Sequence, residues 1–341
     1  MKKSLILALL ASLCFAIEIT DMTGTKVQLQ KPPLKVYAPM PYGSYILYAM
    51  DSDLLSALVF APSEEAKDLL KPRMYTLPVV GSISGDGPNT NLEALLAQKP
   101  DLILMWSSSQ KLRQGSIDER IVKMNIPVAY AVAENFEDYP KVFRFLGELL
   151  DRKERGEKLA AHFEKTIAAV KAVVAKSKTK PKVYYAEGVD GLTSECDDSI
   201  HVELLKTLGD LNVHRCTTTS HKGFEKVTIE QILLYNPDVI VAQEKKFVDS
   251  VFSDPKWKTI AAVKNKQVYL IPKLPFNWFD RPPSFMRLIG LQWLANILYP
   301  NEYPLDLVAE TKAFYLEFLG VKLSDAQLAR ILTPQSIRRS K

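Results

Sequence analysis

Two cysteines and three histidines gather in the second half of the chain, and these are residue types that can bind metals or form cross-links. They are Cys196, His201, His214, Cys216 and His221. Three interpretations of the cysteines are open: a disulfide, which an even count favours in an oxidising compartment, two buried free thiols, or a soft metal site completed by the histidines. The intervals match no zinc-finger spacing.

The sequence contains two near matches to known catalytic or cofactor motifs, and both fail at a required position. Residues 81–85, GSISG, have isoleucine at the central position of a nucleophile elbow, and residues 85–87, GDG, lack the third glycine of a dinucleotide loop. There is no GxxxxGK[ST] and no HExxH, and four scattered histidines are too few to suggest a hydrolytic zinc site. The sequence favours binding over catalysis. An exported two-lobed enzyme with a metal or hydrolytic site in its cleft stays open as the alternative.

An internal repeat predicts the elements that must position any site. Residues 91–105, NLEALLAQKPDLILM, align without a gap with residues 228–242, TIEQILLYNPDVIVA. Each copy has two turns of helical spacing, a proline that ends the helix, and an apolar run suited to a buried parallel strand. A second echo, Lys35-Val36-Tyr37 against Lys182-Val183-Tyr184, opens each half. We therefore expect the α/β class, with two related lobes whose ligand would lie outside the carboxyl ends of the strands.

A long helical segment is expected between the lobes. An apolar stripe at helical spacing is formed by Leu159, Phe163, Ile167, Val170 and Val174. If residues 139–178 form mostly one helix, it is about 50 Å long and acts as a strut, although Gly147 and Gly156 could break it in two. The expected organisation is thus an N-terminal α/β lobe over 17–138, a linking helix over 139–178, and a C-terminal α/β lobe over 179–341. The last of these includes an amphipathic run at 285–298 and a helical tail at 308–332.

Composition and the amino terminus narrow the class of protein. With 341 residues, 47% of them apolar, and a net charge of +5, the chain reads as an ordinary folded protein. It has no Lys/Arg cluster interleaved with aromatics, so we expect no nucleic-acid partner. Residues 1–16 combine two lysines, an apolar run and small residues at Cys14 and Ala16, which predicts a cleavable secretory signal and a periplasmic protein. Lipoprotein anchoring at Cys14 is the less favoured alternative.

Three segments in order carry a family resemblance. The opening ITDMTGTKVQL, the two repeat copies, and NWFDRPP at residues 277–283 resemble the periplasmic binding proteins of ABC importers that take up ferric siderophores, haem, cobalamin and related metal chelates. The resemblance covers nearly all of the chain after residue 16. It implies two Rossmann-like lobes joined by a single long helix, a shallow ligand cleft between them, and extra C-terminal helices packed on the second lobe.

Loops at the expected strand ends supply the candidate ligand-binding residues. They are Tyr42, Tyr45, Trp106, His214, His221, Trp278 and Arg281. Aromatic faces suit the flat apolar parts of a chelate, arginine suits its carboxylates, and histidine could complete a metal's coordination sphere or donate to an anion. The aromatic residues could instead fill the lobe's upper core. No intrinsic cofactor is expected. The ligand expected first is a ferric siderophore, with cobalamin, haem, a nickel chelate and molybdate as alternatives.

Glu93 and Glu230 occupy the same position in the two repeat copies. In the proteins that this chain resembles, a glutamate on each lobe meets arginines of the membrane permease, which implies docking of a monomeric receptor on a two-fold permease dimer. A structural role is compatible with docking. Thr90 could form a capping box with Glu93, and Glu230 lies in a first helical turn where the helix dipole favours a carboxylate.

Overall fold

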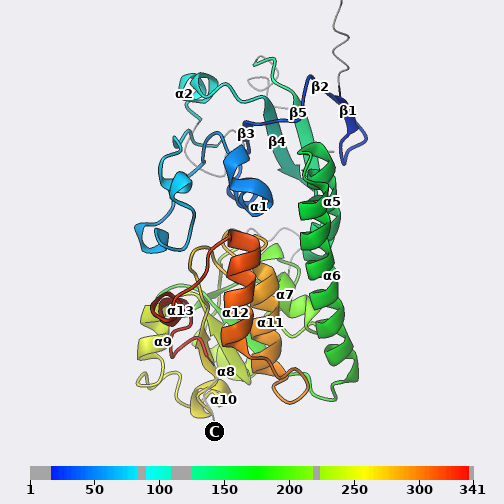
Figure 1. The fold of residues 1–341 in the computed structure, drawn as a ribbon. Coiled ribbons are helices and arrows are strands. Elements are labelled where there is room, and N and C mark those ends of the chain that lie inside the picture. Colours follow the sequence, from blue (N-terminus) through cyan, green and yellow to red (C-terminus); the bar gives the residue numbers. More distant parts are fainter. Residues whose placement is uncertain (1–16, 83–89, 109–123, 218–222, 338–341) are drawn as a thin grey trace, which may run out of the picture.

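Two α/β lobes stacked along a long helix make up the protein (Figure 1). The computed structural model describes residues 17–82, 90–108, 124–217 and 223–337. We call the lobe with the β3-β4-β5 sheet the first lobe and the lobe with the β10-β9-β6 sheet the second lobe.

Both main sheets are three-stranded and parallel, and a small antiparallel ribbon accompanies each. The first lobe contains β1 (Ile17–Thr20), β2 (Lys26–Leu29), β3 (Val36–Tyr37), β4 (Leu102–Ser107) and β5 (Val128–Val132). The second contains β6 (Val183–Ala186), β7 (Thr193–Ser194), β8 (Glu225–Lys226), β9 (Val239–Ala242) and β10 (Val268–Leu270). Two further short apolar runs, at residues 127–131 and 267–271, contain most of β5 and all of β10.

The internal repeat has the predicted helix–strand form in both lobes. Its copies form α2 (Leu92–Ala97) with β4, and α8 (Ile229–Tyr235) with β9, and each strand is the middle one of its sheet. The repeat extends to hydrogen bonds. The Asp101 carboxylate accepts from the Lys35 amide at 3.0 Å, and the Asp238 carboxylate accepts from the Lys182 amide at 2.9 Å. The predicted repeat is therefore confirmed: its two copies form the same elements and lie in equivalent places in their lobes.

Helices surround the sheets, and α6 (Lys153–Lys176) runs alongside both lobes (Figure 1). In the described part of the chain the remaining α-helices are α1 (Pro41–Asp51), α5 (Tyr139–Leu149), α6 (Lys153–Lys176), α7 (Glu203–Thr207), α9 (Lys245–Ser250), α10 (Ala261–Lys264), α11 (Arg287–Leu298), α12 (Leu307–Phe314) and α13 (Asp325–Ile331), with a π-helical turn at Tyr315–Leu319 and several short 3-10 turns. Helix α11 is buried on nearly every side. The amphipathic pattern expected for 285–298 is therefore wrong, and the helix belongs to the core.

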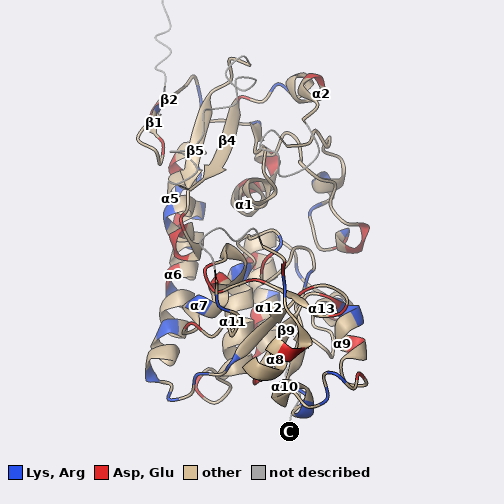
Figure 2. Cartoon of the chain, turned by 180° about the vertical axis from the view of Figure 1, so that it is seen from behind, with Lys and Arg blue, Asp and Glu red and all other residues tan. Residues whose placement is uncertain are grey.

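The predicted single strut over 139–178 is two helices. Helix α5 ends at Leu149 and α6 begins at Lys153, with Asp151 between them at a positive φ of 55°. Gly147 and Gly156 are where the helices touch, since a Cβ on Gly156 would meet the Phe143 carbonyl oxygen at 2.4 Å. The linking helix is thus α6 alone, with α5 folded back along it. Figure 2 shows both signs of charge along this pair, in keeping with the ion pairs of Arg144 to Glu157 and Glu164.

The C-terminal helices pack on the second lobe, as expected, but they also hold the first. The Tyr48 hydroxyl donates to the Leu319 carbonyl at 2.9 Å, and the Arg330 guanidinium binds both carboxylate oxygens of Asp68 at 2.9 Å. One hydrophobic core runs from the first lobe through α5, α6 and α11 into this tail. The lobes are therefore joined by packed helices on more than one path, which restricts hinge opening.

Candidate functional site

A cavity of about 620 Å³ opens between the lobes, and we call it the cleft. The loops after β4 and β5 and the start of α1 line it from the first lobe, while the start of α7 and the segment before α11 line it from the second. First-lobe lining residues include Pro41, Tyr42, Tyr45, Trp106, Ser107 and Asn135. Second-lobe lining residues include Ile200, His201, Glu203, Arg281, Pro282 and Arg287. The cleft therefore lies outside the carboxyl ends of parallel strands, which is where such sheets are expected to bind ligands.

The first-lobe wall is aromatic. Pro41 starts α1, which brings Tyr42 and Tyr45 to the cleft, and Trp106 lies near the end of β4. The rings of Tyr42 and Trp106 meet edge to face, with centroids 5.8 Å apart. Tyr45 stacks across the lobes on Phe276 at 3.8 Å. Three of the four predicted aromatic residues are therefore gathered in one wall, where ring faces and edges can contact an apolar ligand.

Arg281 is the predicted cation of the second-lobe wall, and buried carboxylates hold it. Its Nε donates to Glu187 Oε1 at 2.8 Å, its Nη2 pairs with Glu195, and its guanidinium lies 3.7 Å from the ring centroid of Phe224. Glu187 and Glu195 are 2% and 0% exposed. Burial raises the pKa of Glu187, and the ion pair with Arg281 opposes that rise. The arginine is therefore fixed in position before any ligand arrives.

His201 lines the same wall, although it was not among the residues that the sequence predicts for the cleft. Its Nδ1 hydrogen-bonds the carboxylate of Asp280, which is fully buried, and its Nε2 lies 3.4 Å from Arg281 Nη1. An arginine can only donate, so Nε2 accepts and Nδ1 carries the proton. The available signal was Asp280, which precedes Arg281 in NWFDRPP. Its partner His201 lies 79 positions away in the sequence, so the sequence alone does not connect the two.

Arg287 is a second cation that sequence reasoning missed. It is 4% exposed, donates to Glu203 Oε2 at 2.7 Å, and lies over the ring of Phe136 at 5.2 Å. Its Nε has no hydrogen-bond partner. A lone arginine beginning an otherwise apolar helix was the available signal. Together the two arginines make the second-lobe wall rich in hydrogen-bond donors.

Two predicted ligand residues lie elsewhere, and a third is outside the described residues. Trp278 is fully buried and donates to the Tyr315 hydroxyl at 3.3 Å, so it belongs to the core of the second lobe and its prediction as a cleft residue is wrong. His214 is also buried, between Tyr235 at 3.1 Å and Glu225 at 2.7 Å, and does not line the cleft. His221 lies outside the described residues.

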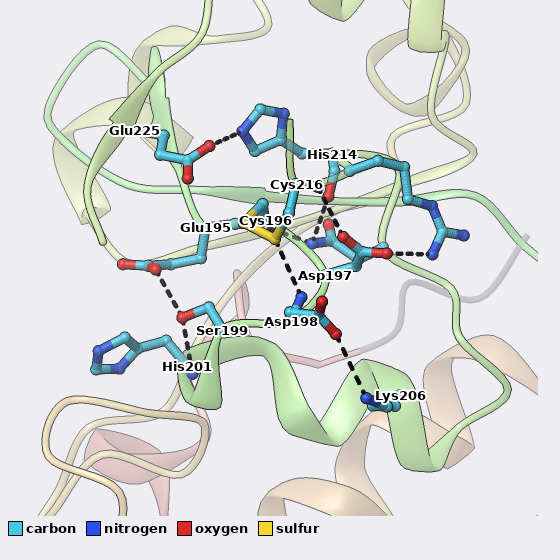
Figure 3. Close-up of a disulfide and its surroundings, with 12 residues drawn as sticks. Glu195, Cys196, Asp197, Asp198, Ser199, His201, Lys206, His214, Cys216 and Glu225 are labelled. Atoms are coloured by element: carbon cyan, nitrogen blue, oxygen red, sulfur yellow. Dashed lines mark hydrogen bonds and ion pairs between the residues drawn. A yellow bond between two sulfur atoms is a disulfide. The ribbon is translucent and has the colours of Figure 1, made fainter. Parts of the chain in front are cut away.

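A disulfide joins Cys196 to Cys216, with Cα atoms 4.8 Å apart. Cys196, Asp197 and Cys216 form a cluster with metal-ligand atoms, but bonded sulfurs cannot act as thiolate ligands. The two histidines do not converge on the sulfurs either. In Figure 3, His214 faces Glu225 and His201 lies on the other side of the disulfide, and the Nδ1 of His201 bonds Asp280. The soft metal site considered for these residues is therefore wrong. The bond instead links the segment that carries Glu195, Ser199 and His201 to the segment at Cys216.

Glu93 and Glu230 are both exposed, in the first turns of α2 and α8. These two helices lie on different lobes (Figure 1). The capping box expected between Thr90 and Glu93 is wrong, because Asn91 caps α2 by accepting from the Ala94 amide at 3.0 Å. In α8 the capping box is formed by Thr228 and Gln231. Neither glutamate is needed as a cap.

Across the described residues, the structure holds no helix with the length and apolarity to cross a bilayer.

Comparisons with known proteins agree with this architecture. The periplasmic binding protein family model matches residues 63–274. A solved ABC transporter solute binding protein from Sulfurospirillum deleyianum is 36% identical, with a TM-score of 0.82 over 92% of this chain and 98% of its own. The molybdate-binding protein MolA of Haemophilus influenzae is 26% identical over 97% of this chain and 99% of its own length.

A third relative, the Fe(3+)-citrate-binding protein YfmC of Bacillus subtilis, is 26% identical over 60% of this chain and 64% of its own. These relatives are named for binding solutes rather than for catalysis, and their ligands differ. The family match spans more than half of the chain, and the lobes, sheets and cleft agree with it. The chain belongs to the periplasmic binding protein family, as a substrate-binding protein of the ABC transporter type.

Proposed function

We propose that this chain is a periplasmic receptor that captures an anionic metal chelate, a ferric siderophore first among them, and delivers it to an ABC importer without changing it chemically. The observation that carries the proposal is the cleft, with aromatic rings on one wall and two arginines on the other. Aromatic faces accept the apolar parts of a chelate, while arginines pair with its carboxylates or net negative charge. A pocket of about 620 Å³ lies within the usual range for small-molecule sites.

The relatives are named for different ligands, so other chelates and anions must also be considered. MolA and YfmC are named for molybdate and ferric citrate. A bare oxyanion would leave most of a cavity of this size unfilled and would use none of the aromatic wall. We therefore rank a bulky ferric chelate above molybdate, and we keep cobalamin, haem and nickel chelates as alternatives.

Fluorescence titration of the untagged protein, residues 17–341, tests the proposal. The panel holds ferric hydroxamate, catecholate and citrate complexes, cobalamin, haem, a nickel–histidine complex and molybdate. We expect saturable quenching by at least one ferric chelate, and weakening by about 100-fold in Arg281→Gln, because truncating one partner of a buried charge pair is costly. Molybdate as the sole binder would contradict the chelate assignment, and no binding to any panel member would contradict the proposed function.

Delivery is assigned to the matched glutamates. Glu93 and Glu230 are exposed at equivalent positions on two related lobes, which suits a partner with two-fold symmetry. We expect the double variant Glu93→Ala, Glu230→Ala to lose importer-dependent uptake while ligand affinity stays unchanged. Glu302→Ala, which also removes an exposed carboxylate, is the matched control and should transport normally. Loss of ligand binding in the double variant would refute the docking role.

The export and assembly state belong to the same proposal. A cleavable signal at residues 1–16 would place the receptor in the periplasm, and one monomer would dock on one permease dimer.

An enzyme in the same cleft is the second candidate, because the Asp280 and His201 pair resembles the orienting half of a catalytic triad. In the described part of the chain, however, Nε2 of His201 faces Arg281 rather than a serine or cysteine hydroxyl or thiol. Mass spectrometry of the chelate after incubation separates the candidates: a receptor returns it intact, and an enzyme returns a product.

A further inference from the structure

The imidazole of His201 has the surroundings of a metal ligand. A ligating histidine usually donates one ring nitrogen to a carboxylate, and this contact fixes the tautomer and turns the other nitrogen toward the metal. Here Nδ1 bonds Asp280, which also accepts from the Tyr185 hydroxyl at 3.2 Å. Asp280 is held in turn by its own backbone amide, which donates to Asn277 Oδ1 at 3.0 Å. The orientation of His201 is therefore set from behind by a buried network.

The other nitrogen belongs to the cleft. His201 is one of the lining residues, and its side chain is 21% exposed. Nε2 accepts only a long contact of 3.4 Å from Arg281 Nη1. That guanidinium is anchored through Nε on Glu187 and through Nη2 on Glu195, so Nη1 can leave Nε2 without the arginine losing its main partners.

We propose that His201 Nε2 coordinates the metal of the bound chelate directly, so that the receptor selects metal chelates with an open or labile coordination position. The inference rests on the proposed function. On binding, the imidazole replaces a labile water on the metal, which leaves to solvent, and no other covalent or coordination bond is made or broken. Arg281 Nη1, released from Nε2, donates to an anionic oxygen of the chelate. This pairing of a neutral nitrogen ligand with a cation suits a chelate that is anionic overall.

The test compares two chelates of one metal. Nickel(II) nitrilotriacetate leaves two coordination positions open to an imidazole, whereas nickel(II) ethylenediaminetetraacetate leaves none that is readily exchanged. Calorimetry on the untagged chain should show the open chelate binding at least about tenfold more tightly. In His201→Gln this preference should disappear.

A matched control separates His201 from another histidine of the chain. His162 also bonds a carboxylate through Nδ1, at 2.6 Å from Glu317, and its side chain is likewise 21% exposed, but it lies on α6 and does not line the cleft. His162→Gln should keep the preference. If this control variant loses it, or if His201→Gln keeps it, the inference is overturned.

A spectroscopic readout guards against a merely structural effect. Copper(II) nitrilotriacetate bound to the protein should show the remote-nitrogen modulation of a coordinated imidazole in pulsed EPR, and this signal should vanish in His201→Gln. Asp280→Asn tests the positioning residue, and we expect the open chelate to bind about 10- to 100-fold more weakly. Circular dichroism checks that each variant is folded.

The outcomes also separate this inference from the function it rests on. If coordinatively saturated ferric chelates bind in the cleft while the open chelate has no advantage, the receptor function stands and the role of His201 falls. If the open chelate fails to bind the native chain at all, the inference is likewise overturned. If the open chelate binds through His201 but no panel chelate is transported, the site stands and the proposed function falls.

Discussion

The two lobes are built from the same αβ unit, yet they bring opposite chemistry to the cleft. The first lobe contributes the rings of Tyr42, Tyr45 and Trp106, and the second contributes His201, Arg281 and Arg287. The shared repeat ends at Met105, two residues before the end of β4, and at Ala242, the last residue of β9. Beyond that point the loops differ. The repeat therefore sets where a ligand can lie, and the loops that it does not include set which ligand is bound.

The difference has an energetic consequence. Aromatic side chains need only neighbours of suitable shape, whereas buried charges need partners before the ligand arrives. The second lobe provides these partners for Arg281 through Glu187, Glu195 and Asp280, and the disulfide at Cys196 adjoins Glu195 in the chain. We therefore expect variants of the ionic wall to change stability, pH dependence and binding together, and variants of the aromatic wall to change binding alone.

The largest effect is expected from Arg281→Leu. This change leaves Glu187 and Glu195 buried without their cation, and breaking a buried pair in this way costs about 3 kcal/mol of unfolding free energy. Urea denaturation at pH 7 measures it. Trp106→Leu is the control from the other wall and should cost clearly less. Equal losses from the two variants would contradict the comparison.

The loss of unfolding free energy in Arg281→Leu, called the deficit below, should also depend on pH. Burial raises the pKa of Glu187 in the folded chain, and Arg281 restrains the rise. A carboxyl with a raised pKa binds its proton more tightly when folded, so its contribution to stability is greatest at low pH and is lost as pH rises through the folded value.

Without Arg281 the pKa rises further, and the deficit should be largest at pH 7 and shrink toward pH 4.5, the ordinary value of glutamate. Urea denaturation repeated across this range measures the change. A deficit independent of pH would show that Glu187 is not the group involved.

A somewhat smaller effect is expected from removing the disulfide. Cys196 and Cys216 are 20 positions apart, and losing a bond across such a loop costs about 2 to 3 kcal/mol. Because the bond adjoins Glu195 and the turn with His201, the variant Cys196→Ser, Cys216→Ser should also bind its chelate more weakly. Thermal unfolding and titration of the same preparation test both effects. Lower stability with unchanged affinity would separate the bond from the ionic wall.

The smallest effect is expected from Trp106→Phe. Trp106 lines the cleft, while Trp257, Trp278 and Trp293 are buried. The variant should lose most of the ligand-induced quenching and about 1 kcal/mol of binding free energy, as for one aromatic contact, with normal stability at every pH. Fluorescence gives the quenching and calorimetry gives the affinity. Trp257→Phe is the control, and quenching that survives in Trp106→Phe would place the ligand elsewhere.

The sequence predicts the frame better than the chemistry within it. The repeat correctly predicts β4 and β9 as strands after short helices, and the strand-end rule brings Tyr42, Tyr45, Trp106 and Arg281 to one cavity. Trp278 lies three residues from Arg281, yet it turns into the core, where its carbonyl packs so closely on Gly290 that a Cβ there would lie 1.8 Å from the oxygen. Sequence position alone does not give the direction in which a loop side chain points.

The missed residues depend on contacts between distant segments. His201 is oriented by Asp280, and Arg287 is paired with Glu203 from another element. No periodic pattern marks residues 195–203, which are held by the disulfide and by hydrogen bonds instead. The sequence allowed the expected strut to break in two at Gly147 or Gly156, but the break lies between them at Asp151, because both glycines serve helix contact rather than the turn itself.

A crystal of the protein with a bound ferric chelate, measured at the iron absorption edge, tests the central claim most directly. The anomalous peak should lie in the cleft, with the aromatic wall of the first lobe on one side and His201 and Arg281 on the other. A peak on an outer face of either lobe, or at the disulfide, would contradict it.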